Sequence, residues 1–326
     1  MSACQNTNTL EVQQGRPEYV TIQGEEFTTN RIELNLIGRG LTDEDIIPLQ
    51  YMTSLRQLSL GHNNITDITP LAGLVNLNNL LLNDNQISDI SPVANFTNAN
   101  ELALWLHNNE ISDISPLTNL TNLTILSLQN NEISDLSPLS NLTNLVDVWL
   151  GENQISDLSP LANFTSIIDL SLIDNYISDV TPLSNLTTLS SLVLHGNQIS
   201  DFASLQNLSN LVFLDLSNNE IIDMQPLSDL NYLHALSLGS NQIVDLPPES
   251  LPINLARLNL RDNQISDLTS LANLTYLTHL WLDENQISDL TPLSNLTNLS
   301  ELRLQNNEIS DWSPVEHVDN VQGRRR

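Results

Sequence analysis

The stretch "LSLQNNEISDLSPLSNLTNL", residues 126–145, recurs with small changes through most of a chain of 326 residues. An Asn in the pattern L-x-L-x-x-N-x-I-x-D marks each regular copy, with Val148 once replacing the first Leu. The markers lie 22 residues apart except for one interval of 24, and they are Asn63, Asn85, Asn109, Asn131, Asn153, Asn175, Asn197, Asn219, Asn241, Asn263, Asn285 and Asn307. A fixed period of this length predicts a solenoid, in which each coil packs only against its neighbours.

One weaker copy precedes the regular ones. It reads "IELNLIGRGLTDEDIIPL", residues 32–49, with Arg39 at the Asn position. Together the copies predict about thirteen coils. We divide the chain into a polar N-terminal tether (1–17), a cap with the degenerate first repeat (18–53), the leucine-rich-repeat solenoid (54–315) and a C-terminal tail (316–326).

Each copy begins with the pattern of a strand. Leu126 and Leu128 alternate with Ser127, as on a strand with one buried face. The backbone must then turn inside the coil, where an unpaired amide costs about 1–3 kcal/mol. The side chain of Asn131 offers both a donor and an acceptor at that point, so the markers are expected to stack into an Asn ladder above core residues such as Ile133.

The second half of each copy predicts a short helical or 3-10 turn on the convex side. Asp135 is expected to be its N-cap, and Pro138 suits the first turn because its missing N–H has no partner to lose there. Leu139 and Leu142, three residues apart, are expected to face the core.

Aspartate recurs at the expected cap position thirteen times, from Asp43 and Asp67 to Asp311. Like charges about 5 Å apart in water repel by roughly 0.8 kcal/mol, whereas a cap contributes about 1 kcal/mol. The caps can therefore outweigh their mutual repulsion. We interpret the column as structural, with a site for calcium or another hard cation as the alternative.

The wording of residues 131–145, "NEISDLSPLSNLTNL", resembles the 22-residue repeats of bacterial internalin-type leucine-rich-repeat proteins. The likeness runs from residue 31 to about residue 315. It implies an α/β solenoid, a horseshoe with a parallel β-sheet on the concave face and short helical or 3-10 segments on the convex face. It also implies an exported bacterial protein that binds a protein on its concave sheet.

The ends of the chain depart from that family's pattern. Internalins begin with a helical cap, whereas "YVTIQGEEFTTNRIELNL", residues 19–36, looks like strands. The final "VEHVDNVQGRRR", residues 315–326, contains no immunoglobulin-like region or wall-anchor motif. Host invasion, which is known for internalins, is therefore not carried over to this sequence.

Composition argues against several classes of function. Ten basic residues, all of them Arg, face 39 acidic ones, and the net charge of −29 repels nucleic acids and anionic membranes. No apolar run approaches the roughly 18 residues that cross a bilayer. The histidines are scattered, and no phosphate loop, nucleophile elbow or metal-ligand pair stands out. We expect no enzymatic activity, no cofactor and no metal site, and a monomer.

The single cysteine, Cys4, lies in "MSACQNTNT". Ser-Ala-Cys resembles the end of a bacterial lipoprotein cleavage motif followed by a polar tether, although no hydrophobic stretch precedes it in this sequence. Cys4 is therefore either a lipidation site or incidental. The protein is expected to be extracellular or on the cell surface, with a cytoplasmic location as the alternative.

The residues that vary between copies at outward strand positions should carry the specificity, because packing fixes the others. In the middle of the chain they are apolar groups mixed with acids, which is typical of an interface. The alternative is that each side chain packs under its neighbour as tolerated surface. This central group comprises Trp105, Ile125, Asp147, Trp149, Glu152, Asp169, Ile173, Asp174, Val193, Phe213 and Asp215.

A second group lies near the C-terminal end. Arg beside Trp is common at binding hot spots. The alternative is salt bridging across strands, for example between Arg261 and Asp283. This C-terminal group comprises Arg257, Arg261, His279, Trp281, Asp283, Glu284 and Arg303.

Two segments break the repeat wording. Residues 98–110, "NANELALWLHNNE", belong to the 24-residue interval, so either Leu102 and Leu104 or Leu104 and Leu106 supply the inward pair, leaving Trp105 free to bulge outward. Residues 245–258, "DLPPESLPINLARL", keep the period but replace the usual letters, so Leu251 and Pro252 should fill the core differently. We favour the first break as functional, because it lies beside an exposed Trp.

Two functions remain open. The first is an exported module that binds a protein or a glycan on its concave face. The second is an intracellular scaffold whose acidic concave face docks a basic protein.

Overall fold

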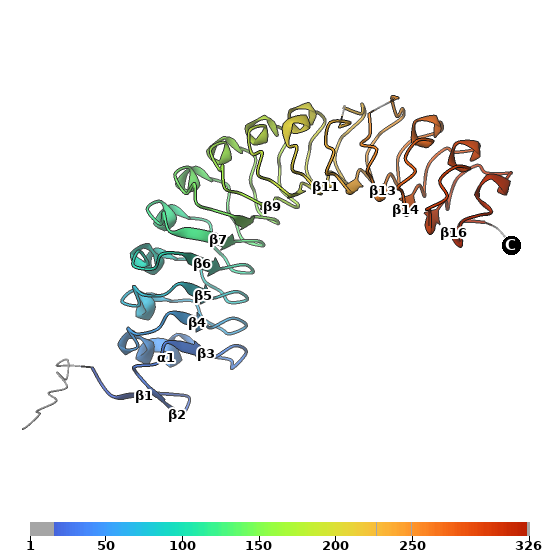
Figure 1. Ribbon diagram of the computed structural model, residues 1–326. Helices are drawn as coiled ribbons and strands as arrows, with labels where there is room; N and C mark the ends of the chain where they lie inside the picture. Colours follow the sequence, from blue (N-terminus) through green and yellow to red (C-terminus); the bar gives the residue numbers. More distant parts are fainter. Residues whose placement is uncertain (1–15, 226, 249, 325–326) are drawn as a thin grey trace, which may run out of the picture.

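The solenoid and its parallel sheet are confirmed by the computed structural model, which describes residues 16–225, 227–248 and 250–324. Fourteen strands follow one another in sequence order. Figure 1 shows them on the inner side of an arc, with the helical turns on the outer side. The strands are β3 (Glu33–Asn35), β4 (Gln57–Ser59), β5 (Asn79–Leu81), β6 (Leu102–Trp105), β7 (Leu123–Ser127), β8 (Asp147–Trp149), β9 (Asp169–Ser171), β10 (Ser191–Val193), β11 (Phe213–Asp215), β12 (Ala235–Ser237), β13 (Arg257–Asn259), β14 (His279–Trp281), β15 (Glu301–Arg303) and β16 (Asn320–Gln322).

The N-terminal cap begins with strands, as the sequence predicts. β1 (Tyr19–Ile22) and β2 (Glu25–Thr28) form an antiparallel hairpin ahead of the large sheet. The degenerate first copy then forms α1 (Asp43–Ile46) and η1 (Ile47–Tyr51). At the other end, β16 pairs with β15, so the sheet continues into the segment that the sequence assigned to a tail.

The convex turns are 3-10 helices. Their shortness follows from the period, because a coil of 22 residues has room for one tight turn after its strand and its Asn. They are η2 (Thr69–Leu71), η3 (Ser91–Asn95), η4 (Ser115–Leu117), η5 (Ser137–Leu139), η6 (Ser159–Leu161), η7 (Thr181–Leu183), η8 (Ala203–Asn207), η9 (Thr269–Leu271), η10 (Thr291–Leu293) and η11 (Ser313–Val315).

One continuous aliphatic core runs along the solenoid. In the quoted copy, Leu126, Leu128, Ile133, Leu139 and Leu142 have no exposed surface. Because every coil repeats these positions, each aliphatic layer rests on an equivalent layer in the next coil, with Phe or Val replacing Leu in places such as Phe96, Val148 and Phe164.

The predicted Asn ladder is confirmed in full geometric detail. The side-chain amide of Asn153 donates to the carbonyl oxygens of Leu150 in its own coil and of Leu128 in the preceding coil, at 3.1 and 2.9 Å. Its Oδ1 accepts the backbone N–H of Ile133 at 2.9 Å. One buried side chain thus satisfies backbone groups in two successive coils, which fixes their spacing.

A left-handed residue precedes the ladder Asn in all twelve regular copies, a feature that the sequence interpretation missed. Positive φ angles occur for example at Asn130 (52°), Glu152 (55°) and Gly196 (69°). Asn, Asp and Gly, the residues that tolerate this conformation, dominate the position, so the signal was present in the sequence. The exceptions are His62, Ser240, Glu152 and Glu284, and the two Glu residues adopt this uncommon conformation without a side chain that favours it.

The assignment of the repeated aspartate as N-cap is wrong by one residue. In the quoted copy the N-cap is Leu136, and Asp135 lies before it. Asp135 Oδ1 still accepts the N–H of Ser137, the first residue of the 3-10 turn, at 2.8 Å. This two-residue relation is an Asx turn, and it favours Asp because a short acceptor reaches its own backbone there.

The same bond recurs through the column, which supports its structural role. The aspartates that make it are Asp67, Asp89, Asp113, Asp157, Asp179, Asp201, Asp267, Asp289 and Asp311. Asp43 differs, because it accepts the N–H groups of Thr66 and Asp67 in the next coil. Within the described part of the chain, no group of three or more His, Cys, Asp or Glu residues is placed to hold a metal ion.

The two irregular segments keep the core closed. Leu104 pairs in register with Leu126, so Leu104 and Leu106 are the inward pair. The expected bulge at Trp105 is wrong, because Trp105 pairs in register with Ser127 and the irregularity lies between Leu102 and Ala103, at the start of β6. In the second segment Leu251 and Pro252 are both buried, as expected.

Candidate binding surface on the concave face

Three rows of side chains line the concave face. Row one holds the first outward-facing residue of each strand, and row two holds the second. Row three holds the outward-facing residue that follows the next inward Leu. In the β8 copy these residues are Asp147, Trp149 and Gly151. In this register Asp147 lies beside Asp169 in row one, and Trp149 lies beside Ser171 in row two. Such neighbours on adjacent strands are about 4.8 Å apart at the backbone.

Most of the predicted site residues fall in these rows, whereas Glu152, Asp174 and Glu284 lie one residue beyond row three, at the left-handed turn position. Row one contains Ile125, Asp147, Asp169, Phe213, Arg257 and His279; row two contains Trp105, Trp149, Val193, Asp215, Trp281 and Arg303; row three contains Ile173 and Arg261. Sequence periodicity thus placed each of them on the correct face. Whether they bind a ligand stays a prediction.

Two tryptophans stack at the centre of the concave face. Trp105 on β6 and Trp149 on β8 are two strands apart, yet their ring centroids are 5.5 Å apart and their planes differ by 24°. Ser127 lies between them on β7 and is 1% exposed. A small residue at this position lets the two indoles lean together over it. The indole N–H of Trp105 is held by Asn79 Oδ1 at 3.2 Å.

Aliphatic and aromatic groups surround the pair. Ile125 and Val193 are half-buried, and Phe213 is 37% exposed. Ile173 packs onto Gly151, where an added Cβ would come within 3.3 Å of the Ile173 Cβ. The expectation that neighbours partly cover one another therefore holds for some contacts, but a half-buried apolar surface remains along the middle strands.

Two carboxylates lie next to each other beside this apolar surface. Asp147 and Asp169 occupy adjacent row-one positions. Burial of Asp147, together with the charge of Asp169, raises the pKa of Asp147 above its ordinary value. Like charges directly opposite on neighbouring strands are destabilising, so this arrangement costs stability in the free protein.

The C-terminal group is largely paired within the chain. Arg303 lies over the ring of Trp281, with its guanidinium carbon 5.2 Å from the ring centroid. Glu301 Oε1 accepts the Trp281 indole N–H at 3.0 Å and the Arg303 Nε–H at 2.7 Å. These two hydrogen bonds, that from Trp281 first, lower the pKa of Glu301. His279 contacts the same indole edge-on, at 6.4 Å between centroids.

The expected ion pair between Arg261 and Asp283 is wrong, because Arg261 pairs with a different acidic residue. Arg261 binds Glu284 Oε1 at 2.8 Å instead, since the exposed Glu284 side chain reaches it more easily. Asp283 is 7% exposed, its Oδ1 is buried without a hydrogen-bond partner, and burial raises its pKa. Arg257 is exposed in row one beside His279. Salt bridging within the chain therefore explains much of this group.

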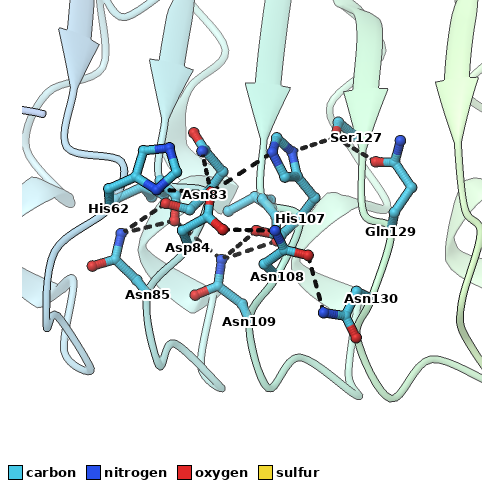
Figure 2. Close-up of polar contacts among 12 residues, drawn as sticks. His62, Asn83, Asp84, Asn85, His107, Asn108, Asn109, Ser127, Gln129 and Asn130 are labelled. Atoms are coloured by element: carbon cyan, nitrogen blue, oxygen red, sulfur yellow. Dashed lines mark hydrogen bonds and ion pairs between the residues drawn. The ribbon is translucent and has the colours of Figure 1, made fainter. Parts of the chain in front are cut away.

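A polar network near the N-terminal end escaped the sequence interpretation. Figure 2 shows Asp84 at its centre, accepting the side-chain amides of Asn83 and Asn108 at 2.6 and 2.7 Å. His62 Nδ1 lies 3.4 Å from the same carboxylate. Although burial opposes it, these contacts lower the pKa of Asp84. Asp84 and Asn108 are the left-handed residues that precede the ladder asparagines Asn85 and Asn109. The position that shapes the turn in each coil therefore also supplies side chains of this network.

The network includes a Ser, a His and an Asp, but the geometry does not suit nucleophilic catalysis. Ser127 is 1% exposed and donates its hydroxyl to Gln129 Oε1 at 2.6 Å. His107 Nδ1 lies 2.8 Å from Ser127 Oγ, and its Nε2 is 4.0 Å from Asp84. A nucleophile must be accessible and hydrogen-bonded to a base. Here Ser127 is buried beneath the tryptophan pair, and its hydroxyl donates to Gln129 rather than to His107.

Comparison with known families and structures decides the class of the protein. The family described as Leucine Rich repeats (2 copies) matches residues 53–95, 103–141, 121–163, 253–295 and 277–317. The crystal structure of an internalin (inlF) from Listeria monocytogenes is similar at 38% identity and a TM-score of 0.86, over 93% of this chain and 91% of that one. The chain belongs to the internalin-type leucine-rich-repeat family.

Other structures share the architecture of this internalin-type chain. A leucine-rich-repeat protein of Leptospira interrogans matches at 25% identity and a TM-score of 0.80, over 90% of this chain and 84% of that one. The structure described as PEPR1-AtPEP1 matches at 26% identity and a TM-score of 0.68, over 81% of this chain and 40% of that one. No curated protein matches the internalin-type chain significantly. None of its described helices has the length and apolar character to cross a bilayer.

Proposed function

We propose that this internalin-type protein is a non-enzymatic module that binds a protein ligand on its concave face, centred on Trp105 and Trp149. The stacked, half-buried tryptophan pair carries the proposal. Exposed aromatic surface on a rigid sheet loses little conformational entropy on binding, so its burial by a partner is available as binding free energy.

The acids around the pair support a protein rather than a glycan as the ligand. Asp147 and Asp169 form a charged flank beside an apolar centre, which is the arrangement of a protein interface with a polar rim. By contrast, the arginines Arg261 and Arg303 are already engaged by Glu284 and Glu301. We therefore place the C-terminal group at the edge of the binding surface.

The proposed location is extracellular or on the cell surface, and the solenoid is proposed to be a monomer. Lipid attachment at Cys4, which lies outside the described residues, is part of this proposal. Membership of the internalin-type family supports export. The alternative is a cytoplasmic scaffold. Cell fractionation with an antibody against the folded chain separates the two, and metabolic labelling with a palmitate analogue tests Cys4 against Cys4→Ser.

The binding proposal is tested on the folded chain. Proteins captured from candidate extracts would be identified, purified and titrated against the wild type, Trp149→Ala and Tyr276→Ala. Tyr276 is a matched control, because it is 60% exposed but lies outside the three rows. We expect Trp149→Ala to weaken the ligand by roughly thirtyfold, about 2 kcal/mol, and Tyr276→Ala to leave it unchanged. Equal affinities of all three proteins would refute the concave site.

A further inference from the structure

The C-terminal end of the sheet shows how this scaffold binds a cation. Trp281 in row two, Arg303 beside it on the next strand and Glu301 in row one form one unit. The Arg303 guanidinium lies over the indole at 5.2 Å, and its terminal nitrogen is 2.7 Å from Glu301 Oε1. An aromatic face and a carboxylate together thus hold one guanidinium.

The centre of the sheet repeats two of these three positions. Trp149 occupies the row-two position of Trp281, and on the next strand Asp169 occupies the row-one position of Glu301. Ser171 stands where the cation-bearing Arg303 stands in the other unit. Asp147 adds a second carboxylate at the position of His279.

Trp105 covers only one face of the Trp149 ring, the face on the side of β6. Trp105 comes from β6, on the N-terminal side of β8, and stacks on one face of the Trp149 ring. Because the two planes differ by only 24°, the opposite face is on the side of β9, the strand that carries Asp169. Arg303 approaches Trp281 from the same direction, since β15 follows β14 in the sheet.

The surrounding charge favours a cation supplied from outside the chain. The sequence contains no Lys or Arg from residue 57 to residue 256, which includes β5 to β12. Burial first, and then the charge of Asp169, raise the pKa of Asp147 above its ordinary value, and no cationic side chain counteracts them. The two acids are therefore complementary to a positive group.

We propose that the concave centre binds an arginine side chain of a basic protein segment, with its guanidinium over the outer face of Trp149 and hydrogen-bonded to Asp169 and Asp147. This inference rests on the proposed function and names the chemistry of its ligand. Arginine fits better than lysine, because its planar guanidinium stacks on an indole and spans two carboxylate oxygens at once. The neighbouring apolar residues Ile125 and Val193 would then contact the flanking residues of the segment.

Synthetic peptides test the proposal on the full chain. The probes are a fluorescein-labelled (Gly-Arg)4 peptide, the same peptide with citrulline in place of arginine, and a lysine version. Citrulline keeps the shape and most hydrogen bonds of arginine but carries no charge. Fluorescence anisotropy should show the arginine peptide binding at least about tenfold more tightly than the citrulline peptide, and several-fold more tightly than the lysine peptide.

Three variants locate the site. Asp169→Asn should weaken the arginine peptide about 3- to 30-fold. Ser171→Arg should abolish binding, because the chain would then supply its own guanidinium as Arg303 does. Glu110→Gln removes the same charge from an exposed position outside the rows and should change the affinity less than about twofold.

Each outcome decides the proposal. Equal binding of the arginine and citrulline peptides, or no binding of either, overturns the guanidinium site. Equal effects of Asp169→Asn and Glu110→Gln also overturn it, because binding would then reflect the overall charge of −29. The concave binding function fails on a different result, namely that a captured protein ligand is indifferent to Trp149→Ala.

Discussion

The backbone N–H of Ile133 donates to Asn153 Oδ1 at 2.9 Å, so a residue in one coil is held by the ladder Asn of the next. We expect Asn153→Ala to lower the free energy of unfolding by about 1–3 kcal/mol or more, because the buried backbone groups it serves lose their partner. Asn144→Ala is the matched control, since Asn144 is exposed and makes one bond, to the Thr121 carbonyl oxygen. Urea unfolding measures both; equal changes would show that the ladder does not hold the coils together.

Trp149 and its neighbour Leu150 point to opposite faces of the sheet and should differ in what they stabilise. Leu150 has no exposed surface, and Leu150→Ala should cost about 2–5 kcal/mol by opening a cavity. Trp149→Ala removes the stack on Trp105 and should cost only about 1 kcal/mol. Thermal unfolding compares them. If Trp149→Ala destabilises as much as Leu150→Ala, the indole is a core residue.

Glu152 adopts the left-handed conformation, with φ of 55°, without the tolerance of Asn or Gly. Glu152→Asn should therefore raise the free energy of unfolding by up to about 1 kcal/mol. The reverse test is Gly196→Ala, which places a Cβ against the Asp174 side chain at φ of 69° and should lower it by about 1 kcal/mol or more. A stability loss in Glu152→Asn would contradict this explanation.

The repeated aspartates should make the protein sensitive to acid. Hydrogen bonds from the backbone and hydroxyl groups of the following Ser or Thr lower the pKa of Asp113, Asp135, Asp179, Asp267, Asp289 and Asp311 below the ordinary value of 3.8. A group with a lowered pKa in the folded state stabilises fully above its unfolded value and loses that contribution as pH falls through the folded value. The raised pKa values of Asp147 and Asp283 act in the opposite sense, but the lowered ones are more numerous.

Stability should therefore fall as pH decreases below about 4. Asp289→Asn keeps an acceptor for the N–H of Thr291 but removes the titration, so the variant should show a shallower dependence of unfolding free energy on pH. Chemical unfolding between pH 6 and pH 3 measures the slope. A slope equal to that of the wild type would mean that Asp289 does not contribute to the acid sensitivity.

The repeat copies allowed us to predict the fold and whether each residue faces inward or outward. This was possible because the periodic leucines must all point into the core of the coil. The position of the aspartate was missed by one residue, since the sequence does not distinguish a helix N-cap from an Asx turn before a single 3-10 turn. The Arg261 partner was wrong for a related reason: Asp283 and Glu284 are adjacent in sequence, and only the path of the turn decides which carboxylate is exposed.

The sequence by itself determined the solenoid, the parallel sheet, the Asn ladder and the row to which each variable residue belongs, because all of these follow from local periodicity repeated at constant spacing. Tertiary structure alone decided which outward side chains meet. Trp105 and Trp149 are 44 residues apart in the chain and two strands apart in the sheet, and they touch because Ser127 between them is small. Trp281 is engaged by Arg303, whereas Ser171 leaves Trp149 without such a neighbour. These contacts depend on side-chain size and direction across neighbouring coils, which the wording of one copy does not specify.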